Sequence, residues 1–295
     1  MSTLAPRPIL VGLDGSNHGS RAVDWAIAEA TSRKLPLHLV HALETGVTVW
    51  SPMMVVPTDL GDQRWILESA LQHIRKVAPE LSVTSAITSG PASAALEAAS
   101  AEADTLVVGA RGRGVVGSIL LGSTSLHVVN HAHSPVVVVR EESSDAEART
   151  AERVVVGFDG SHLSDDALAF AFAAASHRHL PLDIVIAWDT EELATYQLAP
   201  AIAEEVRAAA NHHRHELAAA AAAPWAEKYP DVETRIHVVT DVPAKALVDR
   251  SADAALVVVG SRGLGSVRGA LMGSVSADVL RHAHCPVAVI RPTVS

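Results

Sequence analysis

Residues 11–16 read VGLDGS and residues 156–161 read VGFDGS, so one motif opens two parts of the chain. Three more segments recur in the same order: residues 107–112 and 258–263, residues 121–123 and 272–274, and residues 131–136 and 282–287. Two matched units of this size indicate duplication, so we predict domains at residues 1–140 and 153–295. Residues 141–152, rich in serine, alanine and acidic side chains, read as a linker.

Within each copy, short apolar runs alternate with stretches of helical periodicity. In the first copy we expect strands at residues 8–13, 37–43, 83–88, 105–109 and 136–140, and helices around residues 22–30, 62–77, 92–103 and 123–131. Continuously apolar strands are typical of a parallel sheet covered on both faces, and each parallel crossover needs a helix. The sequence therefore predicts an α/β protein with a doubly wound parallel sheet in each copy.

The composition argues against several classes of protein. Of 295 residues, 48% are hydrophobic and 19% are charged, which is enough apolar side chain to form folded cores. The formal net charge of −10 disfavours nucleic acid as a partner, because binding to a phosphate backbone needs a basic surface. A single cysteine, Cys285, fits a reducing compartment. We see no signal-peptide pattern and no apolar run near the ~20 residues of a membrane helix, so we expect a cytoplasmic protein without membrane contact.

The most specific pattern follows the predicted fourth strand of each copy. Gly109, Gly112 and Gly122 precede Ser123 with the spacing G-x2-G-x9-G-S, and Gly260, Gly263, Gly273 and Ser274 repeat it. Glycine lets backbone amides approach an anion, and a helix that begins at the serine presents free N–H groups and the positive end of its dipole. We expect the serine hydroxyl to cap that helix and to donate to a phosphate oxygen. The alternative is that the glycines only form tight turns.

Charged side chains accompany these loops. Arg111, Arg113 and Arg262 would complement an anion, whereas Leu264 stands where the first copy has Arg113. Asp14 and Asp159 end the predicted first strands, and the carboxyl ends of neighbouring parallel strands meet at one crevice. Each carboxylate either bonds its own turn or meets ribose hydroxyls or a phosphate-bound Mg²⁺.

Several other site motifs are absent or broken. The chain has no P-loop and no G-x-S-x-G nucleophile elbow. A dinucleotide-type G-x-G-x-x-G starts at Gly112, but Arg268 breaks it in the second copy. The histidine pairs at residues 131 and 133 and at residues 282 and 284 have no acidic or cysteine partner at metal-binding spacing, so we interpret them as solvated loop residues.

The two intact motifs, V-G-x-D-G-S and G-x2-G-x9-G-S, resemble those of the universal stress protein family in its tandem form. The resemblance implies Rossmann-like domains with five parallel strands in the order 3-2-1-4-5, helices on both faces, and pairing of domains or chains into a homodimer across the fifth-strand edge. It also implies ATP binding, with adenine against the backbone at the end of strand two. The implied first site comprises Gly12, Asp14, Ala42, Gly109, Ala110, Arg111, Gly112, Arg113, Gly114, Gly122, Ser123 and Thr124. The implied second site comprises Gly157, Asp159, Ala187, Gly260, Ser261, Arg262, Gly263, Leu264, Gly265, Gly273, Ser274, Val275 and Ser276.

The functional expectation is an ATP-binding regulatory module with two sites per chain, acting through an unknown protein partner in stress adaptation, dormancy or growth control. Two alternatives stay open. One is a slow nucleotide hydrolase at the same site, against which the absence of a general base or activated nucleophile argues. The other is a nucleotide-independent scaffold that uses the apolar residues 47–57 as its contact surface.

Overall fold

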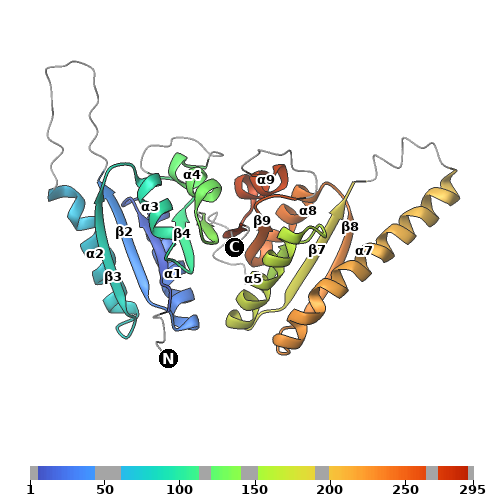
Figure 1. Ribbon diagram of the computed structural model, residues 1–295, viewed down its shortest axis with the longest axis horizontal. Helices are drawn as coiled ribbons and strands as arrows, with labels where there is room; N and C mark the ends of the chain where they lie inside the picture. The colour runs from blue at the N-terminus through green and yellow to red at the C-terminus, as the bar shows by residue number, and fades with distance from the viewer. Residues whose placement is uncertain are drawn as a thin grey trace, which may run out of the picture. The chain divides into compact units, whose positions relative to one another are not determined.

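The computed structural model describes residues 6–43, 61–112, 121–140, 152–189, 199–263 and 272–291. The chain divides into two compact units, residues 1–141 and 142–295 (Figure 1). Some of the expectations above lie outside the described residues: the positions Arg113, Gly114, Leu264 and Gly265, the apolar residues 47–57, and nearly all of the linker.

The first unit alternates strands and helices as predicted. Its elements are β1 (Ile9–Leu13), α1 (Asn17–Arg33), β2 (Leu37–Leu43), α2 (Gly61–Val77), β3 (Val83–Ser89), α3 (Ala92–Ser100), β4 (Thr105–Gly109), α4 (Ser123–His131) and β5 (Val136–Val139). The predicted bounds of β2, β4 and α4 are confirmed, whereas the predicted helix 92–103 ends at Ser100. Ala101 and Ala103 follow Ser100, and because alanine favours helix the predicted helix was too long. The element type was predicted correctly.

The strands of the first unit are parallel and lie in the order β3-β2-β1-β4-β5. Strand β1 lies between β2 and β4, with Leu13 opposite His41 and Val11 opposite Val107. The chain therefore proceeds outward from β1 in one direction and then returns to its other side. This reversal opens the crevice where open α/β sheets bind ligands.

The second unit repeats this topology. Its elements are β6 (Arg153–Gly157), α5 (His162–Arg178), β7 (Leu182–Trp188), α7 (Pro200–Lys228), β8 (Thr234–Thr240), α8 (Pro243–Arg250), the short 3₁₀ helix η2 (Ser251–Asp253), β9 (Ala254–Gly260), α9 (Ser274–His282) and β10 (Val287–Ile290). The order β8-β7-β6-β9-β10 corresponds to 3-2-1-4-5 within this unit. The predicted fold, two Rossmann-like parallel sheets, is confirmed.

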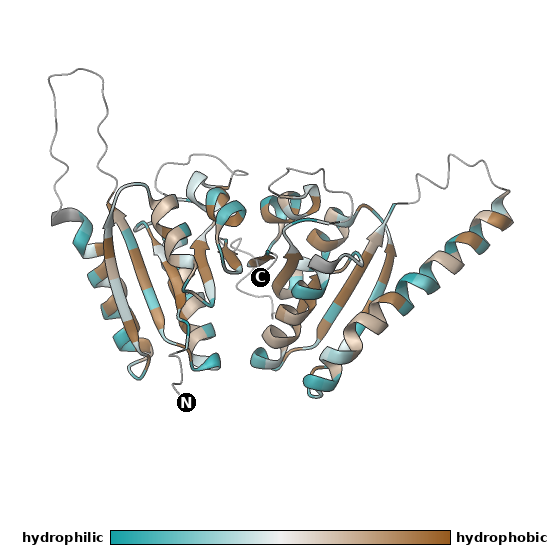
Figure 2. Cartoon of the chain, viewed as in Figure 1, coloured by the Kyte–Doolittle hydropathy of each residue, from teal (hydrophilic) through white to brown (hydrophobic). Residues whose placement is uncertain are grey.

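Helices cover both faces of the first sheet. Gly109 packs against His18 of α1, and Gly12 packs against Leu96 of α3. Because Gly12 and Gly109 occupy alternating positions in the paired register, their side-chain directions are opposite, and α1 and α3 lie on opposite faces. The inner strands β1 and β4 are accordingly apolar along most of their length, while the edge strand β3 and the helices are mixed (Figure 2).

Local signals define where the first helix starts and stops. The Ser16 side chain accepts a hydrogen bond from the Gly19 amide at 3.1 Å and caps the N-terminus of α1. Lys34 ends the helix in the left-handed region at φ 54°. Among the helices that the structure describes, none combines the length and apolarity needed to cross a membrane.

Candidate functional site

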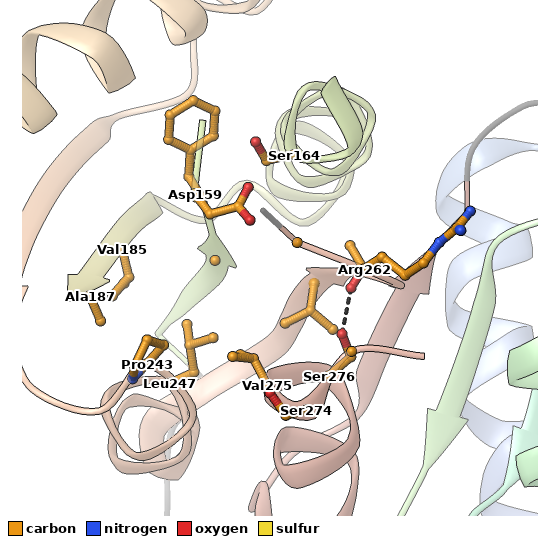
Figure 3. Close-up of a pocket in the computed structure, with 16 residues that line it drawn as sticks. Asp159, Ser164, Val185, Ala187, Pro243, Leu247, Arg262, Ser274, Val275 and Ser276 are labelled. Carbon is orange, nitrogen blue, oxygen red and sulfur yellow. Dashed lines mark hydrogen bonds between the residues drawn. The ribbon is translucent and has the colours of Figure 1, made fainter. Parts of the chain in front are cut away.

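Each unit has a cavity above the carboxyl ends of its central strands. The cavity of the first unit measures about 470 Å³ and that of the second about 320 Å³, within the range of roughly 300–1,000 Å³ typical of ligand pockets. The first is lined by Gly12, Leu13, Asp14, Val40, His41, Ala42, Gln63, Ala92, Leu96, Val108, Gly109, Arg111, Gly112, Gly122, Ser123, Thr124 and Ser125. The second is lined by Gly157, Phe158, Asp159, Ser164, Val185, Ala187, Pro243, Leu247, Val259, Gly260, Arg262, Gly263, Gly273, Ser274, Val275 and Ser276 (Figure 3).

Most of the residues implied by the resemblance thus come together. Ala110 and Ser261 are exceptions, since neither lines a cavity. Their backbones instead close the loops: the Gly122 amide donates to the Ala110 carbonyl at 2.8 Å, and the Gly273 amide donates to the Ser261 carbonyl at 2.8 Å. The amides of Gly122 and Gly273 are consequently engaged with protein. A phosphate would have to use the amides of the helix that follows.

The aspartate at the end of the first strand reaches across to the glycine loop in both units. Asp14 Oδ1 accepts hydrogen bonds from the Ser16 amide at 3.0 Å and the Ser16 hydroxyl at 2.6 Å, and Asp159 bonds Ser161 with the same lengths. The other oxygen, Oδ2, lies so close to Gly112 that a Cβ on that glycine would be 2.6 Å away. Oδ1 therefore bonds the turn, as one of the two interpretations has it, while Oδ2 lies against Gly112, which also lines the cavity.

The helix after the glycine loop begins without a side-chain cap. Gly122 is the N-cap of α4 and Gly273 that of α9, and no described side chain caps either helix. The expectation that the Ser123 and Ser274 hydroxyls cap these helices is wrong, because both serines lie one position inside. The first N–H groups of each helix have no partner within the helix and border the cavity, which favours an anion there.

Sequence reasoning missed a serine that anchors each of these helices. Ser125 Oγ donates to the Gly109 carbonyl at 2.7 Å, and Ser276 Oγ donates to the Gly260 carbonyl at 2.6 Å (Figure 3). Ser276 was expected in the site but as a ligand contact. These bonds hold the start of the helix against the end of the strand. In the sequence, the only local sign of this anchoring role was a polar residue two positions after the expected start of the helix.

The glycines of the site fall into two groups by what a side chain would meet. A Cβ on Gly12 would lie 2.7 Å from Leu96 Cδ1, and one on Gly109 would lie 2.8 Å from the His18 backbone, so the fold itself requires these glycines. A Cβ on Gly122 would meet its nearest atoms at 3.5 Å, which is ordinary contact. The φ of Gly122 is −63° and that of Gly273 is −74°, values open to any residue. Packing and backbone therefore do not explain glycine at these two cavity positions.

We expect Gly109→Ala to lower the free energy of unfolding by about 1–3 kcal/mol, because the new methyl group overlaps backbone that has no room to move. The matched change Gly122→Ala is expected to leave stability nearly unchanged. Urea unfolding of both variants checks this difference. Equal destabilisation by the two changes would contradict the division of the glycines.

Apolar side chains and one histidine complete the walls. Leu96 of α3 and Leu247 of α8 were not predicted as site residues, because their place depends on how these helices pack on Gly12 and Gly157. His41 was also missed. Its Nδ1 lies 2.7 Å from the Leu13 carbonyl and must donate, since a carbonyl oxygen only accepts. Nε2 is buried and has no hydrogen bond in the described structure.

One predicted arginine lines each cavity, Arg111 in the first unit and Arg262 in the second. Figure 3 shows the Arg262 side chain directed away from Asp159. His131, one of the histidines interpreted as solvated, is stacked on His127 with ring centroids 4.2 Å apart. The hydrogen bond from His127 Nε2 to Glu97, 2.7 Å long, lowers the pKa of Glu97. Among the described residues, no cluster of three metal-binding side chains occurs.

Comparison with known proteins defines the class of protein. The model of the universal stress protein family matches residues 6–140 and 150–291, and the chain belongs to this family. A universal stress protein of Mycobacterium tuberculosis is 37% identical over 97% of this chain and 97% of its own length. The crystal structure of a universal stress protein from Archaeoglobus fulgidus shares the fold, with a TM-score of 0.60 and 20% identity, covering 98% of this chain and 99% of that one. A functionally unknown Pseudomonas aeruginosa protein gives a TM-score of 0.67 at 18% identity, covering 98% and 94% of the two chains.

Proposed function

We propose that each unit binds one ATP and that the chain acts as a nucleotide-responsive regulatory module. The observation that carries the proposal is the lack of a side chain at Gly122 and Gly273, where neither packing nor backbone conformation requires glycine. Both glycines border a cavity at the uncapped start of a nine-residue helix. A side chain there would fill the space beside the free N–H groups. An anionic ligand that approaches those groups accounts for its absence in both units.

The rest of each cavity suits the other parts of the nucleotide. Ala42 and Ala187 border the cavities at the ends of β2 and β7, with Val40 and Val185 beside them, and these surfaces would contact the adenine. Asp14 Oδ2 and its counterpart in Asp159 would accept hydrogen bonds from ribose hydroxyls. Among the described residues, one acidic side chain lines each cavity, so Mg²⁺ would be bound mainly through the phosphates.

Regulation by conformational or oligomeric change is the output that we propose, in the cytoplasm, through a homodimer and a protein partner. A ligand shifts such an equilibrium only by binding one state more tightly than another. Among the described residues that line the cavities, Asp14 and Asp159 are the acidic side chains, and the histidine of the first cavity, His41, is bonded through Nδ1 to the Leu13 carbonyl. The described lining of the second cavity includes no histidine. The side chains that line the cavities therefore favour nucleotide binding over nucleotide hydrolysis.

The nucleotide content of the purified protein tests the proposal. Gently purified full-length chain, denatured and chromatographed, is expected to release adenine nucleotide at close to two molecules per chain, fewer if one site exchanges during purification. Titration calorimetry with ATP on the emptied protein then gives the number of sites. Absence of released nucleotide together with absence of binding heat would refute ATP binding.

A further inference from the structure

The two cavities differ at the second residue of the helix that borders them. Thr124 of α4 lines the first cavity, and Val275 of α9 lines the second. Threonine and valine have nearly the same shape, so the difference is a hydroxyl in place of a methyl group. The flanking residues are the same in both units, with Gly-Ser before this position and Ser after it. The exchange is therefore confined to one polar group at the anion-binding end of the cavity.

The Thr124 hydroxyl is available to a ligand. Thr124 is half-buried, and its hydroxyl makes no hydrogen bond to any residue that the structure describes, whereas the neighbouring Ser125 is committed to the Gly109 carbonyl. Figure 3 shows Val275 beside Leu247 at the wall of the second cavity, where the same position offers only methyl groups. A ligand oxygen at the start of α4 thus meets a hydroxyl donor as well as backbone amides. At the start of α9 it meets the amides and Ser274, the counterpart of Ser123, but no hydroxyl at this second position.

A second difference points in the same direction. His41 lines the first cavity with a buried Nε2 that has no partner in the described structure, and Ile186 occupies the matching place in the second unit without lining the cavity. The first cavity is also the larger one, about 470 Å³ against about 320 Å³. The first site is therefore the more polar and roomier of the two.

We propose, on the basis of the function proposed above, that the two sites are graded: the first binds the phosphorylated nucleotide more tightly, and Thr124 against Val275 sets a measurable part of the difference. A hydrogen bond to a charged group changes affinity by about ten- to a hundredfold. At ligand concentrations between the two dissociation constants, the chain would hold one nucleotide and not two. Occupancy of the second site would then report higher nucleotide levels.

The experiment measures each site alone in the full-length chain. Gly273→Glu closes the second site and Gly122→Glu closes the first, and calorimetry with ATP and with adenosine follows in each background. We expect Thr124→Val to weaken ATP binding at the first site about tenfold or more, and Val275→Thr to strengthen it at the second. Adenosine, which lacks phosphates, should respond to neither change. Thr124→Ser, which keeps the hydroxyl, should retain the affinity for ATP.

The outcomes separate this inference from the proposed function. If both sites bind ATP but neither exchange alters the affinity, the sites are not graded by this position and the inference is overturned while ATP binding stands. If neither site binds ATP in any background, the proposed function fails and the inference fails with it. Arg113 and Leu264 also differ between the copies, so the single exchanges, and not the ratio between the two wild-type sites, decide the question.

Discussion

The double variant Gly122→Glu/Gly273→Glu is expected to lose nucleotide binding in both units and to remain folded. The Cβ of each new side chain meets its neighbours in ordinary contact, 3.5 Å at the nearest, so the backbone need not move. The carboxylate then occupies the space beside the helix N-terminus and repels phosphate at short range. We expect the affinity for ATP to fall by at least ~100-fold, since both space and charge are lost. Calorimetry and the nucleotide content of the purified variant measure the loss.

A control that adds a glutamate outside the cavity distinguishes a local block from a general effect of negative charge. Leu126→Glu adds the same side chain to α4 at an exposed position that does not line the cavity. It should leave ATP binding within about twofold of the wild type. Circular dichroism during thermal unfolding should show the double variant as cooperative as the wild type. If the folded double variant retained full affinity for ATP, the nucleotide would have to bind outside these two cavities.

Removal of the Arg153 guanidinium is expected to cause a large loss of stability in the second unit. Arg153 Nη1 lies 3.3 Å from Asp183 Oδ2, and Nη2 lies 2.9 Å from Asp253 Oδ2. Asp183 is 1% exposed, and its Oδ1 has no hydrogen bond in the described structure. Arg153→Met leaves this buried carboxylate with His237, 3.3 Å away, as its remaining ion-pair partner in the described structure. Loss of one member of a buried pair typically lowers the free energy of unfolding by about 3–5 kcal/mol.

Guanidinium chloride unfolding at neutral pH measures this effect, fitted with separate transitions where the two units unfold independently. Arg153→Met/Asp183→Asn should recover much of the loss, because the uncompensated charge is gone. Arg281→Met, which removes an exposed partner of Asp278, should not shift the midpoint measurably. ATP affinity should be retained, since Arg153 begins β6 and the cavity lies at its other end, at Gly157. An unchanged midpoint for Arg153→Met would contradict the argument.

Residues expected at the site do line a cavity where one short segment contains both the chemistry and the local geometry. The loop from Gly109 to Ser123 was recognised because glycine spacing and a following helix are local features, and the duplicate at Gly260 reinforced them. The caps were misassigned by one residue, because Gly122 and Ser123 are both acceptable N-caps and only the helix packing distinguishes them. Leu96 and His41 were missed, since nothing in their own neighbourhood marks them. Ser125 was missed although a polar residue two positions after the expected helix start was a local signal.

The amino-acid sequence by itself determined that the chain contains two copies of an alternating α/β unit, because periodicity and turn residues are properties of short segments. It also determined that a glycine-rich loop precedes a helix in each copy. Only the tertiary structure decided that Asp14 lies against Gly112. It also decided which glycines the packing requires and which positions have room for a side chain. These facts depend on the packing of strands and helices that are distant in the sequence. Contacts of that kind arise when the whole unit folds, and no local pattern encodes them.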